Sequence, residues 1–379
     1  MSPPADAPTM GSRLARLQAR IAAERLDALL LDTSVDLRYA TGYTGSNGLA
    51  VVPAAGGGGE AAVRDGRPQF LTDFRYVAQA AAEVAPDFER STVAGELRDS
   101  LPGLLAGEVG RLGFDPAKVT VKGHERLLEL LPEGWELIDA NGLLDGLRVI
   151  KEPGEIERIA AACELADEAL REVLEGGLVG RTEREVAFEL ETAMRRRGAE
   201  APSFGSIVAS GSHGALPHAQ PRDVEIPRDV LVTIDWGAVH DGYCSDCTRT
   251  YATGEGIGEE AREIYELVLR AQLAGLEAVQ AGPSGREVDA AARDLIEAAG
   301  HGEHFGHGLG HGVGLEVHEA PRLSRTAPET PLAAGNVVTV EPGVYLPDVL
   351  GVRIEDLVVV RDGGRDVLTG LSKDLTVVG

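Results

Sequence analysis

The spacing of apolar residues predicts alternating helices and strands over the first 145 residues. Leu14, Leu17 and Ile21 recur at helical steps after Ser12, and residues 28–31 read as a short buried strand. Further strands are predicted at 47–52, 70–72, 111–114 and 136–138, and further helices at 76–83 and 124–131. A Pro-rich leader at 1–11 and a glycine loop at 56–59 complete this part. The alternation is typical of an α/β domain, and no glycine spacing or Walker lysine indicates a nucleotide site.

After residues 146–154 the pattern becomes strongly helical. Apolar residues recur at three- and four-residue steps until Gly176-Gly177, and a second helix opens with Thr182-Glu-Arg-Glu185, a capping box. The same succession returns at a constant offset of 102 positions, where a helix opens with Ser284-Gly-Arg-Glu287. Capping boxes are common, so coincidence is the alternative. We predict two similar halves in a pseudo-symmetric α+β domain, with the site between them.

Two aspartates are expected to converge across a β-hairpin. Segments 230–237 and 243–251 read as strands joined by a tight turn around 240–242. With the turn centred between 240 and 241, Asp235 and Asp246 lie directly opposite; centred between 241 and 242, they are diagonal neighbours on one face. Only a three-residue loop would turn the Asp246 side chain away from this face and bring Cys247 onto it. Without a basic neighbour the two carboxylates repel, so a bridging metal ion is the simpler interpretation than a shared proton.

Two later glutamates extend this set. Glu341 and Glu355 each stand at the end or centre of an apolar strand, where a carboxylate is costly unless it is paired. The alternatives are a surface acid at a strand end for Glu341 and an ordinary ion pair with Arg353 for Glu355.

The segment 301–319 contains several histidines, which are candidate metal ligands. It also contains too many glycines to form a stable helix. A His-rich surface loop is the alternative to a site, and spacing alone does not choose a ligand. Four carboxylates and one imidazole would suit two Mn²⁺, Co²⁺ or Zn²⁺ ions ~3.5–4 Å apart. The histidines of this segment are His301, His304, His307, His311 and His318.

Bulk composition excludes several classes of protein. The 379 residues carry a formal net charge of −25, which disfavours binding to nucleic acid or to an anionic membrane surface. No apolar run reaches the ~18 residues of a membrane span, and the N-terminus has no signal-peptide pattern. Cys163, Cys244 and Cys247 are too few for a disulfide framework, which favours the cytoplasm; zinc or redox use of Cys244-x-x-Cys247 is the alternative.

Five separated motifs resemble those of the pita-bread metallopeptidases, in family order. They lie at 216–218, 235–250, 306–319, 341–345 and 353–356. The group that they most resemble is Xaa-Pro dipeptidase (prolidase) and aminopeptidase P. Segments 43–47 and 72–76 resemble, more weakly, the family's N-terminal domain. The resemblance implies an α/β creatinase-like domain over 12–145 and a pseudo-symmetric α+β pita-bread catalytic domain over 153–379.

The resemblance also implies a ligand set for two divalent ions, Mn²⁺ first, with Zn²⁺ or Co²⁺ as alternatives. Asp235 would bind one ion, Asp246 and Glu355 would bridge both, and His311 and Glu341 would hold the other. A hydroxide between the ions would be the nucleophile. Glu341 would be catalytic as well, receiving the water proton and passing it to the leaving nitrogen.

Substrate-binding roles follow from the same motifs. His218 and His318 would contact the scissile carbonyl and steady the tetrahedral intermediate. His307 would line the substrate pocket, and Arg353 would orient the ligands. The histidines without a counterpart in the family motifs, left as pocket rim or structure, are His301 and His304.

The implied activity is hydrolysis of the bond between an N-terminal residue and proline, as a dipeptidase or an aminopeptidase. Small peptides with proline in the second position and a second copy of the chain in a homodimer are the expected partners. Four alternatives remain: a methionine aminopeptidase, although typical members lack such an N-terminal domain; a creatinase-like C–N hydrolase, which works without metals; a hydrolase of another amino-acid derivative; and a non-catalytic binding protein on a peptidase-like fold.

Overall fold

The computed structural model describes residues 10–56 and 62–379. The chain divides into two compact units, Met1–Leu147 and Arg148–Gly379. The predicted leader at 1–11 and glycine loop at 56–59 lie, except for their edges, outside the described residues. The predicted domain limits of 12–145 and 153–379 stay predictions. No helix within 10–56 or 62–379 is both long and apolar enough to cross a bilayer.

The first unit is built on a six-stranded mixed sheet with the strand order β4-β3-β2-β1-β5-β6. Its central strand β1 pairs antiparallel with β2 and parallel with β5. The buried faces of α1 and the sheet confirm the α/β prediction, and each predicted strand and helix has an observed counterpart within a few residues. The strand at 89–92 and the helices at 34–41, 101–104 and 145–148 were not predicted. The strands are β1 (Ala28–Leu31), β2 (Leu49–Pro53), β3 (Gln69–Thr72), β4 (Glu89–Thr92), β5 (Gly110–Phe114) and β6 (Trp135–Asp139). The helices are α1 (Met10–Ala23), α2 (Ser34–Thr41), α3 (Val77–Glu83), α4 (Leu101–Leu104), α5 (Val121–Leu130) and α6 (Asp145–Arg148).

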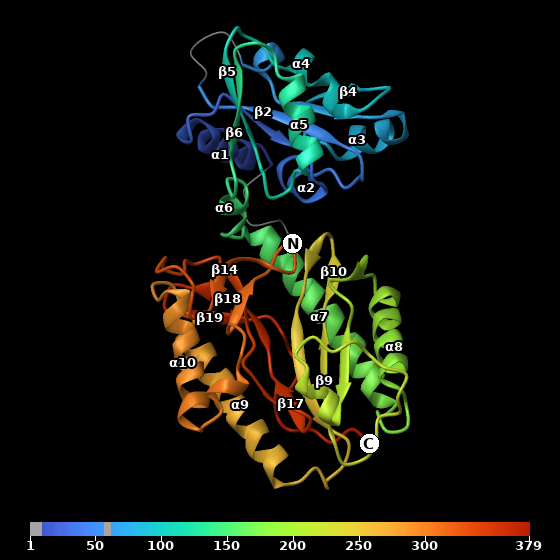
Figure 1. Ribbon diagram of the computed structural model, residues 1–379. Coiled ribbons are helices and arrows are strands. Elements are labelled where there is room, and N and C mark those ends of the chain that lie inside the picture. Colours follow the sequence, from blue (N-terminus) through green and yellow to red (C-terminus); the bar gives the residue numbers. More distant parts are fainter. Residues whose placement is uncertain (1–9, 57–61) are drawn as a thin grey trace, which may run out of the picture. The chain divides into compact units, whose positions relative to one another are not determined.

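Two helix pairs flank the strands of the second unit (Figure 1). The pairs are α7 (Pro153–Glu175) with α8 (Glu183–Arg196), and α9 (Glu259–Ala278) with α10 (Gly285–Ala298). Helices α8 and α10 both begin with a capping box, in which Thr182 accepts from the Glu185 amide and Ser284 accepts from the Glu287 amide. The two similar halves predicted from the sequence are therefore present.

The strands of this unit form several small sheets around a shared centre. One half contributes β12-β9-β8 and β11-β10-β7, and the other contributes β14-β13-β15-β18-β19 with the separate hairpin β16-β17. The strands of the first half are β7 (Ala201–Pro202), β8 (Ile207–Ser210), β9 (Leu231–Trp236), β10 (Ala238–His240), β11 (Tyr243–Cys244) and β12 (Cys247–Ala252). Those of the second are β13 (Gly310–Gly312), β14 (Glu319–Leu323), β15 (Val337–Val340), β16 (Gly343–Leu346), β17 (Leu350–Arg353), β18 (Asp356–Arg361) and β19 (Gly364–Val367).

Two glutamates lie where apolar strands end. Glu341 and Glu355 were predicted at the end or centre of such strands, and the structure has them at strand ends, in the breaks between β15 and β16 and between β17 and β18. Pro342 has no amide hydrogen to continue the ladder, which ends the first strand. The Glu355 amide donates instead to Thr248 O at 3.0 Å, and the Glu341 amide to Leu309 O at 2.8 Å. Both acids thereby leave their own sheet and face the centre of the unit.

Candidate metal centre and substrate cavity

The hairpin that carries the two aspartates has a two-residue turn. His240 pairs with Tyr243 and Trp236 with Cys247, so the turn is centred between Asp241 and Gly242. Both turn residues have positive φ, 46° and 76°, as a tight type I′ turn requires. This is the diagonal register among the predicted alternatives.

Three carboxylates meet at the end of this hairpin. Asp235, the fifth residue of β9, lies opposite Thr248, and Asp246 precedes β12. Glu355 enters from the second half of the unit. One carboxylate oxygen from each of Asp235, Asp246 and Glu355 lies within 4.8 Å of the other two. Acids separated by more than 100 positions along the chain thus share one point in space.

An imidazole and a fourth carboxylate complete the cluster. His311 Nε2 lies 3.3 Å from Glu341 Oε1 and 3.6 Å from Asp246 Oδ2. The Nδ1 atom of His311 is 3.1 Å from Gly312 O. A carbonyl oxygen only accepts, so Nδ1 carries the proton of neutral His311 and the Nε2 lone pair faces the acids. This is the tautomer that a metal-binding histidine needs.

Arg353 corrects one step of the sequence argument, which assumed that no basic residue neighbours the aspartates. Its Nη2 atom lies 2.7 Å from Asp235 Oδ2, and its Nε donates to Thr248 Oγ1 at 3.1 Å. Thr248 in turn donates to Glu355 Oε2 at 2.7 Å. The ordinary Arg353–Glu355 ion pair is therefore not what the structure has: Arg353 holds Asp235 and reaches Glu355 through a hydroxyl. Among the described residues, the guanidinium forms an ion pair with Asp235 but with neither Asp246 nor Glu355.

The electrostatics of the cluster reflect this uneven compensation. Burial, followed by the charges of Glu355 and Asp235, raises the pKa of Asp246 well above its ordinary range. Burial and the charges of Glu341 and Asp235 do the same to the pKa of Glu355. Glu341 is the exception: although burial alone would raise its pKa, the hydrogen bond and charge of a protonated His311 lower it to about 2. Against the effect of burial, Glu341 in turn raises the pKa of His311, so without a metal ion the imidazole carries the second proton on Nε2 more readily. Burial also raises the pKa of Asp235, although the charge of Arg353 opposes this. Without bound cations, three of the four acids therefore resist ionisation.

The cluster forms one wall of a cavity of about 720 Å³, a size typical of pockets for small ligands. All the residues assigned from the family motifs line it. These are Asp235, Asp246, His311, Glu341, Glu355, His218, His307, His318 and Arg353.

The other two histidines lie apart from this wall. His301 and His304 bond to one another, with 3.2 Å between their Nδ1 atoms, and are not among the described residues that line the cavity. Of the two interpretations left open from the sequence, a position on the pocket rim or a structural role, this contact favours a structural role for both histidines.

Sequence reasoning missed a chain of polar contacts on the cavity wall. Arg353 Nη1 donates to Tyr345 OH at 2.8 Å, and this hydroxyl lies 2.9 Å from His307 Nε2. His307 Nδ1 lies 2.8 Å from Gly308 O and must donate to it, so Nε2 accepts from Tyr345. Tyr345 lies within the motif at 341–345, which was the available signal. The chain orients His307 and Arg353 together.

A second missed residue, Glu183, anchors the loop that carries His218. Its carboxylate is fully buried at the start of α8 and accepts from Ser210 N at 2.9 Å and from Arg222 N at 3.0 Å. The Arg222 guanidinium and His213 Nδ1 lie 3.0 and 2.9 Å away. Residues 210 and 222 bracket the loop, so one carboxylate holds both of its ends. A buried glutamate in the first turn of a helix gave no sequence signal beyond its proximity to the capping box.

The residues present fit divalent cations. Asp235 Oδ1 is buried and has no hydrogen-bond partner among the described residues, as expected of an oxygen reserved for a ligand. Carboxylate oxygens with one imidazole are hard donors, suited to divalent ions such as Mn²⁺, Co²⁺ or Zn²⁺. All three cysteines are free and buried, so Cys244 and Cys247 form no disulfide.

The fold and this centre define a metal-dependent hydrolase on the pita-bread scaffold. Comparison with known families agrees: residues 157–362 match the model of Metallopeptidase family M24, and residues 13–150 match that of the Creatinase/Prolidase N-terminal domain. The chain belongs to metallopeptidase family M24 and is an enzyme of that family.

Relatives and solved structures agree with this assignment. An Xaa-Pro dipeptidase of Pyrococcus furiosus is 47% identical over 62% of this chain and 66% of its own length. The structure of an Xaa-Pro dipeptidase from Bacillus anthracis superposes with a TM-score of 0.89 at 38% identity, covering 97% of this chain and all of that one. An X-Pro aminopeptidase from Thermotoga maritima gives a TM-score of 0.83 at 34% identity, with coverage of 94% and 100%. The likeness thus includes both dipeptidases and aminopeptidases.

Proposed function

We propose that this enzyme is a two-metal exopeptidase that cleaves the bond before a proline in the second position of a small peptide. The observation that supports this most is the convergence of four carboxylates and one imidazole on one cavity wall, together with relatives named Xaa-Pro dipeptidase. Asp235 would hold one ion, Asp246 and Glu355 both, and His311 with Glu341 the other. Bound divalent ions would make water nucleophilic near neutral pH and polarise the scissile carbonyl.

The chain's own residues supply proton transfer and orientation. The lowered pKa of Glu341 keeps its carboxylate ionised, so it would accept a proton from the attacking water and pass it to the proline nitrogen as the bond breaks. His218 and His318, exposed in the cavity, hydrogen-bond the carbonyl oxygen as negative charge develops on it. Arg353, fixed by Tyr345, holds Asp235 in place.

An unpaired cation in the cavity favours dipeptides over longer peptides. Arg322 of β14 lies directly opposite His311 of β13, so its side chain shares the cavity face with the imidazole. No carboxylate partner of the Arg322 guanidinium is found within residues 10–56 and 62–379. A dipeptide carries a free carboxylate one residue beyond the scissile bond, and a guanidinium binds such a group through paired hydrogen bonds. A longer peptide has a neutral amide at that point.

The decisive assay compares Ala-Pro, Ala-Pro-Ala and Ala-Ala with the metal-loaded enzyme. We expect Ala-Pro to have the highest kcat/KM and Ala-Ala to be inert. Arg322→Met should raise the KM for Ala-Pro about 10- to 100-fold, the value of a charge-assisted hydrogen bond, and should leave Ala-Pro-Ala nearly unchanged. Arg325→Met is the matched control, because Arg325 is exposed and pairs with Glu297 outside the cavity lining. Hydrolysis of Ala-Ala alone would refute the proline claim, and equal loss on both proline peptides would refute the role of Arg322.

Mn²⁺ remains the proposed ion, with Zn²⁺ or Co²⁺ as alternatives, and elemental analysis of the purified enzyme tests the choice. We also propose a homodimer in the cytoplasm, which sedimentation and fractionation would test.

A further inference from the structure

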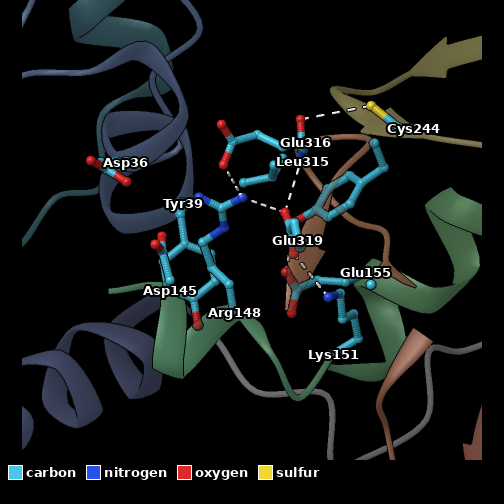
Figure 2. A network of polar contacts seen from close by, with 12 residues as sticks. Asp36, Tyr39, Asp145, Arg148, Lys151, Glu155, Cys244, Leu315, Glu316 and Glu319 are labelled. Carbon is cyan, nitrogen blue, oxygen red and sulfur yellow. Dashed lines mark hydrogen bonds and ion pairs between the residues drawn. The ribbon is translucent and has the colours of Figure 1, made fainter. Parts of the chain in front are cut away.

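A cluster of charged side chains surrounds Glu319, the residue that follows His318, and Figure 2 shows Arg148 and Lys151 pointing toward its carboxylate. Glu319, the first residue of β14, is 6% exposed at its side chain and contacts two cations. Lys151 Nζ lies 2.9 Å from its Oε2, and Arg148 Nη2 contacts its Oε1. Arg148 also reaches the half-exposed Glu316 at 2.7 Å. The side chains of Lys151 and Arg148 are themselves only 1% and 3% exposed.

The two cations stand on backbone that is fixed to the main sheet. The Lys151 amide donates to Gly335 O at 2.8 Å, and the Gly335 amide donates to Val360 O of β18 at 3.0 Å. Asn336 Nδ2 donates to Val149 O at 2.9 Å. These hydrogen bonds fix the segment 148–151, which therefore supports the contacts of Arg148 and Lys151 with Glu319.

The loop that Glu319 closes is folded tightly onto that carboxylate. The Glu316 amide donates to Glu319 Oε1 at 3.1 Å, and the Gly314 amide donates to Glu316 O at 3.0 Å. A Cβ atom at Gly314 would lie 2.7 Å from Glu319 Oε2, so a larger residue there would require the carboxylate to shift. Glu319 thus links the loop to the segment 148–151.

His318 has few other constraints. Its ring packs at an angle of 57° against that of His311, with 4.4 Å between centroids, and no hydrogen bond of this ring is found in the described part of the chain. The direction of the imidazole therefore depends on the backbone at 318, and that backbone is held through the next residue.

We propose that Glu319, clamped by Arg148 and Lys151, is a positioning residue that fixes the backbone of His318 and so aims its imidazole at the scissile carbonyl. This inference rests on the proposed function, because it presumes that His318 acts in turnover. Glu319 is not among the described residues that line the cavity. Its effect reaches the reaction only through its neighbour.

The test is a double-mutant cycle on the metal-loaded enzyme. Glu319→Gln should lower kcat for Ala-Pro about 10- to 100-fold, as expected for a group displaced by about 1 Å, while KM changes less than about threefold and metal content stays constant. In a His318→Ala background the same substitution should change kcat less than about threefold, because the group it positions is absent. Equal losses in the two backgrounds, or a kcat within about twofold of wild type, would overturn the inference.

Two further variants separate positioning from loss of stability. Lys151→Met keeps most of the side-chain volume and leaves the contact between Arg148 and Glu319 in place. If Glu319→Gln fails to fold, Lys151→Met replaces it in the cycle and should show a smaller loss of kcat with the same dependence on His318. Glu316→Gln is the matched control: it removes a charge from the same loop and the same guanidinium, but at an exposed position, and should leave kcat within about twofold. A control as damaged as Lys151→Met would count against the clamp.

Amide hydrogen exchange gives a readout that needs no activity. Glu319→Gln should speed exchange at 314–318 and leave β15 unchanged; unchanged loop exchange refutes the clamp. A wild-type enzyme inactive on every Xaa-Pro peptide refutes the proposed function instead, and that result is independent of every variant.

Discussion

Replacing Glu183 by glutamine should destabilise the catalytic unit by a predictable amount. The side chain is fully buried, and although burial alone would raise its pKa, hydrogen bonds from Arg222 and Ser210 lower it from 4.5 to about 2. That difference corresponds to roughly 3 kcal/mol of stability at neutral pH. Glutamine keeps one acceptor oxygen and turns an NH₂ toward donors. We expect an unfolding temperature roughly 6–12 °C lower, at ~2–4 °C per kcal/mol for a unit of this size.

The pH dependence tests the cause. A carboxyl whose pKa is lowered by folding stabilises the protein above its unfolded pKa, and that stability is lost as the pH falls toward the folded value. The gap between wild type and Glu183→Gln should therefore shrink by about 1 kcal/mol between pH 7 and pH 4. Both proteins are measured by scanning calorimetry after metal removal, so that bound metal does not contribute to the difference between them.

The control is Glu189→Gln on the same helix, whose exposed carboxylate pairs with Arg181. It should cost less than about 1 kcal/mol. A gap that is constant or grows on acidification would refute the electrostatic reasoning, and the cost would then lie in packing alone. Because Glu183 also holds both ends of the His218 loop, activity on Ala-Pro should fall in parallel.

Three further predictions concern the metal centre. Asp246→Ala should abolish turnover and bound metal together, measured by assay and elemental analysis, and activity retained with one ion or none would contradict a bridging role. After chelation the protein should be more stable at pH 5.5 than at pH 8. Folding raises the pKa of Asp246 and Glu355, so the free energy of unfolding falls as these buried carboxyls ionise. In thermal scans, metal-loaded protein should show a flatter dependence of stability on pH. Gly310→Ala should reduce metal binding and stability, because its Cβ would lie 2.0 Å from Thr339 O beside His311, whereas Gly306→Ala, with nothing within 4 Å, should be tolerated.

Local sequence patterns predicted most of the elements and much of the site. Periodicity placed the helices, and the two-residue turns compatible with the hairpin restricted Asp235 and Asp246 to one face. The five family motifs then brought Glu341, Glu355 and His311 to that same site. Roles in binding and turnover stay predictions, since geometry alone shows only that these side chains meet.

The misses share a physical cause, which is contact between residues far apart in the chain. The Arg353–Asp235 pair joins positions 118 apart, and Lys151–Glu319 joins positions 168 apart. No spacing rule indicates such contacts, because they depend on how the two halves dock. The sequence did not decide between a strand end and a strand centre for Glu341 and Glu355 for a related reason: the backbone amides find partners in other strands rather than in their own ladder.

The division of the ligand set between the two halves has a consequence for how the enzyme matures. Asp235 and Asp246 belong to one helix-and-strand half, whereas His311, Glu341 and Glu355 belong to the other. If these side chains hold the ions as proposed, neither half alone offers more than a fragment of the coordination sphere, and cation uptake would report completed docking. A partly assembled chain would then be inactive.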